Sequence, residues 1–216
     1  MRSSGMRFAA TDKSPRSTRV RGLRLRRDDI EIVPNAGLQW EWMQRALSQA
    51  RSAIKAGEVP IGCVLYRANG IAISEGHNTM VDSGIVTAHA EMNAFKAAGR
   101  SIAPGDQVIM VTTLEPCVMC TGAAMQAGVI LIIYGLQAPA DSGTGRVRPP
   151  DSPGATAPVI VGGVGAVESR ALFTEWLDMH AGDKSRSDQR AFVEQLLALT
   201  GVSVAPSVCR IGKTDR

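Results

Sequence analysis

The chain has 216 residues, of which 44% are hydrophobic and 20% are charged, and these values suit one globular domain of ordinary size. No stretch resembles the run of about 20 apolar residues that a membrane-spanning helix needs, so a transmembrane protein is not expected. The four cysteines, Cys63, Cys117, Cys120 and Cys209, are too sparse for a disulfide framework. We therefore expect a cytoplasmic protein with one metal site.

The net charge of +4 is distributed unevenly along the chain. Residues 1–29 hold nine of the 24 basic residues and three of the 20 acidic ones, so residues 30–216 carry a net charge of −2. We predict that residues 1–36 form a basic, disordered arm, because they are rich in Arg and Ser and lack periodicity. The arm could be a dispensable extension, an RNA-binding segment or a transit peptide. The rest of the chain lacks the basic excess of a general nucleic-acid binder.

The first half of the chain predicts a helix, a hairpin and a second helix. Apolar residues recur at three- and four-residue spacing over 38–56, and Gly57 then ends the predicted helix. Two runs rich in β-branched residues, 61–66 and 71–74, flank a turn and predict a β-hairpin. A polar loop leads to the second predicted helix at 88–98, for which Thr87 is the expected N-cap.

The second half of the chain continues the alternation of strands and helices. The predicted elements are strands at 108–112, 129–134 and 159–161, helices at 117–126, 165–179 and 188–199, a long loop at 136–158 and a tail at 201–216. This order predicts an α/β fold with helices on both faces of a central sheet. We assign residues 37–180 to the main domain and residues 181–216 to a C-terminal helix and tail.

Two short segments carry residues that can perform chemistry. Residues 87–91 read Thr-Ala-His-Ala-Glu, and residues 114–120 read Leu-Glu-Pro-Cys-Val-Met-Cys. Zinc binds imidazole and thiolate in tetrahedral geometry, and three protein ligands leave the fourth position open, as catalytic sites require. Cys117 and Cys120 lie one helical turn apart, so both thiolates can face the same side. With His89 they form a candidate catalytic zinc site.

Glu91 lies two residues after His89 and therefore points away from it on a helix. We expect its carboxylate to face water and substrate rather than the metal. Zinc would lower the pKa of a bound water, and Glu91 would take a proton as the hydroxide forms and then return protons to a ring nitrogen and a leaving amine. A structural zinc site is an alternative, but no fourth ligand has finger-like spacing. A redox Cys-x-x-Cys pair or an inert scaffold would leave Glu91 unexplained.

The order His-x-Glu followed by Pro-Cys-x-x-Cys is the signature of zinc deaminases that act on nucleobases. With the segments 59–62, 76–78 and 121–123, it makes residues 38–178 resemble the cytidine and deoxycytidylate deaminase superfamily. The branch that the chain resembles holds tRNA adenosine deaminases, guanine deaminases and yeast-type cytosine deaminases. The resemblance implies a three-layer α/β/α sandwich with a mixed five-stranded sheet, one zinc ion per subunit and a homodimer.

The resemblance also implies roles for individual residues. The zinc ligands would be His89, Cys117 and Cys120, and Glu91 would be the catalytic proton shuttle. Residues 37–180 would then form a zinc-dependent deaminase domain.

Three further residues would contact the substrate if the resemblance holds. Asn78 matches an Asn that hydrogen-bonds the target base in this branch. The backbone amide of Ala90 would face the base, and Trp176 would close the pocket.

The substrate is less well defined than the reaction. In tRNA enzymes the segment after the fourth strand is compact, contains Lys and Gly, and touches the anticodon loop. Here residues 137–157 are longer and Pro-rich, with only Arg146 and Arg148 basic. We therefore expect hydrolytic deamination of a small base or nucleoside of the guanine, cytosine or adenine type, with release of ammonia. The alternative is a tRNA-specific adenosine deaminase that forms inosine at the wobble position.

Overall fold

The computed structural model describes residues 33–103, 105–155, 157–201 and 207–210, so most of the predicted N-terminal arm lies outside the described residues. The chain alternates helices and strands, as the sequence predicts. The elements are α1 (Ala36–Lys55), β1 (Gly62–Arg67), β2 (Ala72–His77), α2 (Met80–Ser83), α3 (Ala90–Ala98), η1 (Gly99–Ser101), β3 (Val108–Leu114), α4 (Val118–Gln126), β4 (Val129–Leu136), β5 (Val159–Gly162), α5 (Ala166–Met179), η2 (Lys184–Arg186), α6 (Ser187–Leu199) and β6 (Ser207–Arg210).

The strands form one mixed sheet in the order β2-β1-β3-β4-β5-β6. Strand β1 is antiparallel to β2 and β3, whereas β3, β4 and β5 are parallel to one another. The prediction of five strands is wrong by one, because β6 comes from the segment that we expected to be a tail. It pairs antiparallel with β5, so backbone groups that would lie at the sheet edge gain partners. The α/β class is confirmed.

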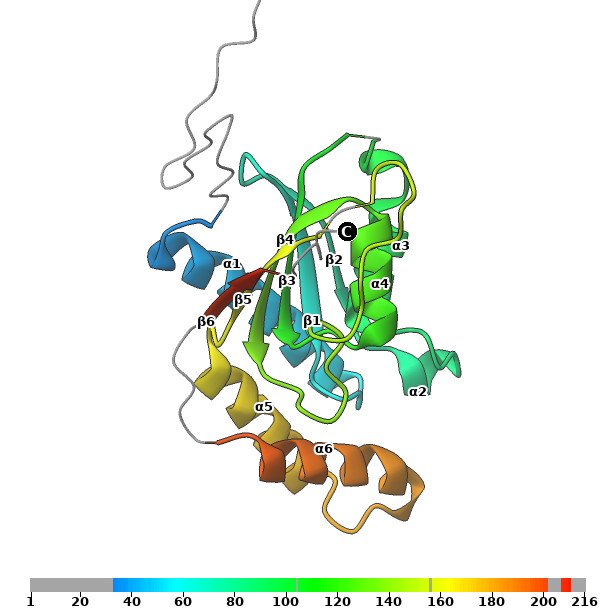
Figure 1. Cartoon of the computed structure of the whole chain (residues 1–216). Coiled ribbons are helices and arrows are strands. Elements are labelled where there is room, and N and C mark those ends of the chain that lie inside the picture. Colours follow the sequence, from blue (N-terminus) through cyan, green and yellow to red (C-terminus); the bar gives the residue numbers. More distant parts are fainter. Residues whose placement is uncertain (1–32, 104, 156, 202–206, 211–216) are drawn as a thin grey trace, which may run out of the picture.

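Helices cover both faces of the sheet and give three layers (Figure 1). Helices α1 and α5 pack on one face, and α3 and α4 pack on the other. Side chains of the central strands alternate between these faces, as the pleat of a β-strand requires. In β3, for example, Ile109 and Val111 join the core cluster under α1, while Val108 and Met110 join the cluster under α3. Among the described helices, none is long and apolar enough to cross a membrane.

Helix α3 begins two residues later than the sequence predicts. Thr87 is not its N-cap, because His89 occupies that position with extended backbone angles. The preceding residue is held outside the helix, where the carbonyl of Ala88 accepts the backbone N–H of Thr79 at 3.0 Å and the side-chain amide of Asn93 at 3.2 Å. Tertiary contacts thus fix where the helix begins and place His89 at its N-terminus.

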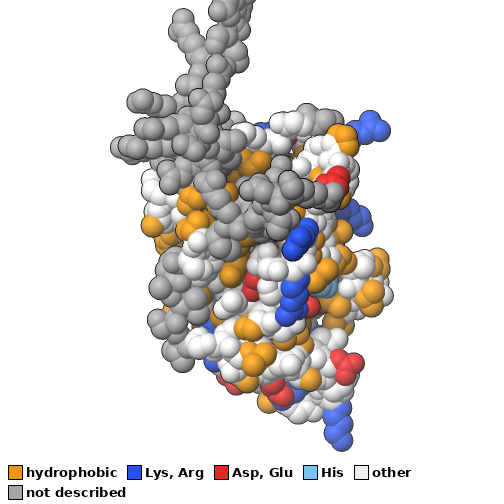
Figure 2. Space-filling model, viewed as in Figure 1, with side chains coloured by type: hydrophobic (Ala, Val, Ile, Leu, Met, Phe, Trp, Pro, Cys, Tyr) orange, Lys and Arg blue, Asp and Glu red, His pale blue; other side chains and the backbone are white. Residues whose placement is uncertain are grey.

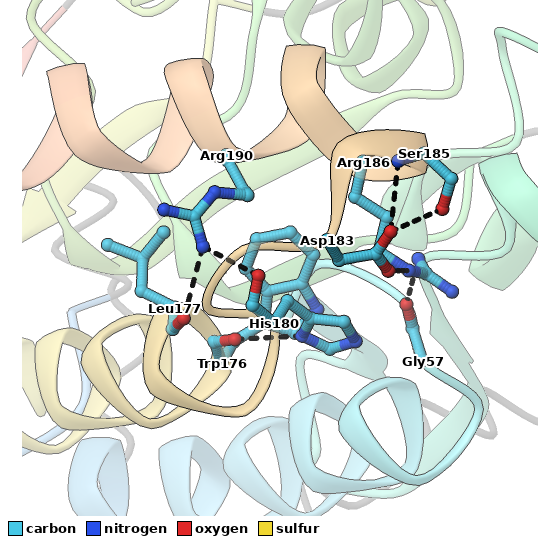
Figure 3. Close-up of polar contacts among 8 residues, drawn as sticks. All are labelled: Gly57, Trp176, Leu177, His180, Asp183, Ser185, Arg186 and Arg190. Carbon is cyan, nitrogen blue, oxygen red and sulfur yellow. Dashed lines mark hydrogen bonds and ion pairs between the residues drawn. The ribbon is translucent and has the colours of Figure 1, made fainter.

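Arginine contacts hold α5 and α6 together as a hairpin and join this hairpin to the turn after α1 (Figure 3). The guanidinium of Arg186 donates to the carbonyl oxygen of Gly57, in the turn that follows α1. Arg190 donates to the carbonyl oxygen of His180 at 2.6 Å, at the end of α5. The predicted helix at 188–199 is therefore part of a packed hairpin that touches the turn between α1 and β1.

Gly76 sets how closely α3 approaches the sheet. A Cβ atom added at this position would lie 2.5 Å from both the carbonyl oxygen of Ala90 and the amide nitrogen of Ala94. We therefore expect Gly76→Ala to lower the free energy of unfolding by about 1–3 kcal/mol, because backbone atoms must move apart. Urea denaturation measures this change.

Gly122→Ala is the matched control, because Gly122 lies in α4 and an added Cβ would meet only Val147, at 4.0 Å. Removing a helical glycine should leave the stability unchanged or raise it by about 0.5–1 kcal/mol. Equal stability of Gly76→Ala and the native chain would contradict the close approach of α3 and β2.

Candidate metal centre

His89, Cys117 and Cys120 meet where two helices begin. His89 is the N-cap of α3, Cys117 is the N-cap of α4, and Cys120 lies in the first turn of α4. One ligand atom from each residue lies within 4.8 Å of the others. The Nδ1 atom of His89 is 3.6 Å from the Sγ atoms of both cysteines. The N-termini of α3 and α4 therefore converge on the three candidate ligands.

These three donors fit a zinc ion. One imidazole nitrogen and two thiol sulfurs are the soft and borderline ligands that zinc prefers. Cys120 is buried, and His89 and Cys117 are half-buried. Three such ligands leave a fourth tetrahedral position for water or substrate. Both helices also direct the positive ends of their dipoles toward the thiolates, which favours the deprotonated form that a metal needs.

The three candidate ligands shift one another's pKa values. A hydrogen bond from Cys120 lowers the pKa of the Cys117 thiol well below its usual value. The same hydrogen bond, with burial, raises the pKa of Cys120. The hydrogen bond with Cys117 raises the pKa of His89, although burial opposes it. A metal ion that binds here must displace these protons, so its affinity depends on pH.

Glu91 lies beside the cluster and is 3% exposed. Its Oε1 atom accepts a 2.7 Å hydrogen bond from the hydroxyl of Thr112 in β3. Its Oε2 atom is 3.4 Å from the Sγ atom of Cys120. Burial raises the pKa of the Glu91 carboxyl, and the Thr112 hydrogen bond opposes this rise. One carboxylate oxygen is thus fixed by the sheet, while the other faces the metal ligands.

The segment after β4 folds back over Cys117. Glu115 is buried and accepts hydrogen bonds from the amide of Ala138 and from the hydroxyls of Ser142 and Thr144. Ser142 also forms an isolated β-bridge with Cys117. The first part of the predicted 136–158 loop is therefore anchored by a buried carboxylate for which the sequence analysis had no role.

Asp141, in this same segment, interacts electrostatically with the cluster. Burial raises the pKa of its carboxyl, and the neighbouring Cys117 thiolate raises it further. The segment therefore brings an acidic side chain to the rim of the metal centre.

Two of the residues with predicted substrate contacts lie near this centre. Ala90 is the first residue of α3, directly after His89, and is fully buried. Asn78 follows β2, is 2% exposed and donates its side-chain amide to Glu58 at 3.0 Å. Glu58 lies four residues before β1 and has no sequence signal of its own.

Trp176 is not at the metal centre. Its side chain is fully buried in the core cluster on the α1 face of the sheet, and it packs against the ring of His180. The metal ligands belong to helices on the opposite face. The structure therefore corrects the expectation that Trp176 closes the pocket, because α5 buries this side chain in the core.

Comparison with known families gives one match over the centre of the chain. The family described as "Cytidine and deoxycytidylate deaminase zinc-binding region" matches residues 38–136, which include all three candidate ligands and Glu91.

Among curated proteins, the chain is 38% identical over 137 residues to a tRNA(Ile)-lysidine synthase of Deinococcus radiodurans, covering 62% of this chain and 23% of the synthase. It is 40% identical over 101 residues to a tRNA-specific adenosine deaminase of Streptococcus pyogenes, covering 45% of this chain and 62% of that enzyme. The chain thus spans less than two thirds of each of these relatives.

Solved structures share the fold. One, from work on adenosine-to-inosine editing by tRNA deaminases at the wobble position, is 31% identical with a TM-score of 0.52, and the match covers 61% of this chain and 98% of the other. Another, a complex with 2,6-diaminopurine, is 25% identical with a TM-score of 0.56, and the match covers 67% and 84%.

Replacing a thiol ligand tests the metal centre directly. We expect Cys117→Ser and Cys120→Ser each to lower the zinc content of the purified protein, because a hydroxyl is a much poorer zinc ligand than a thiolate. Elemental analysis measures the zinc. Cys63→Ser is the control, because Cys63 lies in β1 and is not in the cluster. Unchanged zinc in both ligand variants would refute the assignment.

The hydrogen bond from Thr112 to Glu91 gives a separate prediction. Thr112→Val keeps the shape of the side chain and removes the hydroxyl, so Glu91 loses one partner. We expect kcat to fall about tenfold, which corresponds to about 1.4 kcal/mol, while the zinc content stays the same. Thr112→Ser keeps a hydroxyl at this position and should have a kcat close to that of the native chain.

Thr113→Val is the matched control on the same strand, because the hydroxyl of Thr113 accepts the backbone N–H of Gly62 instead. It should lower stability without a selective loss of kcat. A kcat for Thr112→Val equal to that of the native chain would show that Glu91 needs no support from β3.

Proposed function

The chain belongs to the cytidine and deoxycytidylate deaminase superfamily, and on this basis we propose that it is a zinc-dependent hydrolase that removes an exocyclic amino group from a nucleobase. The observation that carries the proposal is the open His89, Cys117 and Cys120 cluster with the buried carboxylate of Glu91 beside it. A structural zinc site would need a fourth protein ligand and would have no use for this carboxylate.

The residues at the centre divide the reaction between them. A zinc ion held by the three ligands would supply an activated water at neutral pH. Glu91 would accept the first proton of the water on Oε2, the oxygen that Thr112 does not engage, and pass it to the ring nitrogen. It would then take the second proton, from the hydroxyl group added to the ring carbon, and pass it to the leaving amine. A carbonyl group remains on the ring, and ammonia leaves. The raised pKa of Glu91 suits a carboxyl group that must both accept and donate a proton.

We propose a purine as the substrate class. Adenosine-to-inosine editing and the 2,6-diaminopurine complex both concern amino-substituted purines. Two forms of this substrate are possible, adenosine at the wobble position of tRNA and a free base or nucleoside. The curated tRNA adenosine deaminase at 40% identity favours tRNA.

The distribution of charge favours a small substrate. On the face shown in Figure 2, the described Lys and Arg side chains stand singly or in small groups among uncharged ones. Residues 137–157, whose first part folds back over Cys117, hold Asp141 and Asp151 against Arg146 and Arg148. This segment therefore has no net positive charge to attract a polyanion, and a free purine needs no such attraction.

We further propose that the protein binds one zinc ion per subunit and acts as a cytoplasmic homodimer. A reducing compartment keeps thiol ligands available for zinc. Support for a dimer comes from apolar side chains that are exposed around the start of α4 and in the segment before α3. These are Val81, Ile85, Val86 and Val118.

A screen for ammonia release tests the proposed function. The zinc-loaded protein would be offered guanine, 2,6-diaminopurine, adenosine, cytosine and an RNA stem-loop with a wobble adenosine. We expect release from at least one purine, and Glu91→Gln should lower kcat by about 10²- to 10⁴-fold while zinc is retained. Normal turnover by Glu91→Gln, or release from none of these compounds, would contradict the proposal.

A further inference from the structure

One buried side-chain acceptor near the metal centre has no protein partner among the described residues. Asn78 is 2% exposed, and its Nδ2 atom donates to Oε2 of Glu58 at 3.0 Å. Its Oδ1 atom is buried and accepts no hydrogen bond from the described part of the chain. Buried polar atoms nearly always have a hydrogen-bond partner. A bound ligand that donates a hydrogen bond to Oδ1 would supply the missing partner.

Glu58 determines which way the Asn78 amide points. Glu58 is fully buried, and its Oε1 atom accepts the backbone N–H of Asp82 at 2.7 Å. An ionised carboxylate only accepts hydrogen bonds, so the atom of Asn78 that faces it must be the NH₂ group. If the amide turned over, two oxygen atoms would face each other in a buried site. The carbonyl oxygen of Asn78 is therefore held on the side away from Glu58.

The backbone around Glu58 is itself firmly held. Its N–H donates to the carbonyl oxygen of Ala53 at 2.9 Å, at the end of α1. The preceding residue, Gly57, has a φ of 76°, and its carbonyl oxygen accepts a hydrogen bond from Arg186 of the C-terminal hairpin (Figure 3). This turn is thus fixed by the main domain on one side and by the hairpin on the other, so Glu58 has little freedom to move.

Asn78 is also tied to the segment that carries the metal ligand His89. Its backbone N–H donates to the carbonyl oxygen of Ile61, and the next N–H, of Thr79, donates to Ala88 at 3.0 Å. Ala88 immediately precedes His89. The backbone at Asn78 is therefore joined to the segment that leads into α3, where the substrate would meet Glu91 and the metal.

We infer that Glu58 is a positioning residue that makes Asn78 present its carbonyl oxygen to the substrate, so that the site selects a base with an N–H or NH₂ donor at that point. The inference rests on the proposed function. Glu58 need not touch the substrate, because it acts through the orientation of Asn78. A purine whose facing edge carries only a lone pair would leave Oδ1 unpaired, and the site would discriminate against it.

Exchanging the two functional groups tests this assignment. Glu58→Gln places an NH₂ group against Asn78, which favours the reversed amide, and Asn78→Asp places two carboxylates together. We expect each single variant to lower kcat/KM about ten- to a hundredfold on the purine that the native chain turns over best. In the double variant, the introduced glutamine can donate to the introduced aspartate and still accept the N–H of Asp82. An acceptor then faces the substrate again, and kcat/KM should recover to within about fivefold.

Glu75→Gln is the control, because Glu75 is a partly exposed carboxylate that binds Arg45 and Gln49 at the surface. It should not change kcat/KM. Recovery in the double variant supports the assignment. A double variant that is misfolded, or no more active than the weaker single variant, overturns it, as does a Glu58→Gln variant with native activity.

The orientation of Asn78 can also be measured without any substrate. In the native chain, NMR should show side-chain NH₂ protons of Asn78 that exchange slowly and shift in Glu58→Gln but not in Glu75→Gln. Unprotected NH₂ protons would overturn the inference even if ammonia is released. Protected protons without ammonia release from any purine would support the orientation and reject the proposed function, so the two failures are distinct.

Discussion

The convergence of two helix N-termini on one point is the constraint on which the site depends. His89 is the N-cap of α3 and Cys117 is the N-cap of α4, so the starts of the two helices bring the three candidate ligands together. The sheet fixes this geometry, because α3 packs closely over Gly76 and α4 follows β3 directly. A metal ion bound there would interact with rigid elements, which is how an active site keeps its geometry.

Three buried carboxylates each join different parts of the chain, and one of them, Glu91, contacts a candidate metal ligand. Glu91 is supported by Thr112 of β3, Glu115 anchors the segment after β4, and Glu58 engages Asn78 and the backbone of α2. Buried carboxylates are unfavourable unless they are hydrogen-bonded, so each of these contacts is needed for stability. The same contacts would fix the proposed proton shuttle and the orientation of Asn78. If the proposed function holds, stability and function depend on the same hydrogen bonds.

The sequence predicts what is decided locally. The order of the elements, the paired cysteines of α4 and the separation of Glu91 from His89 follow from periodicity and spacing, and the structure has the same arrangement. The start of α3, the sixth strand and the buried position of Trp176 depend on contacts between distant segments, so periodicity cannot reveal them. Glu58 was missed for the same reason, because its partner Asn78 lies twenty residues away in the sequence.

X-ray absorption at the zinc edge tests most directly whether His89, Cys117 and Cys120 form an open catalytic centre. An open site held by His89, Cys117 and Cys120 should give two sulfur neighbours at about 2.3 Å and two lighter neighbours at about 2.0–2.1 Å, one from His89 and one that a bound ligand can exchange. Adding 2,6-diaminopurine or a purine that is turned over should change the lighter shell and leave the two sulfurs in place. Three or more sulfurs, or a closed shell of four protein ligands that no purine perturbs, would contradict it.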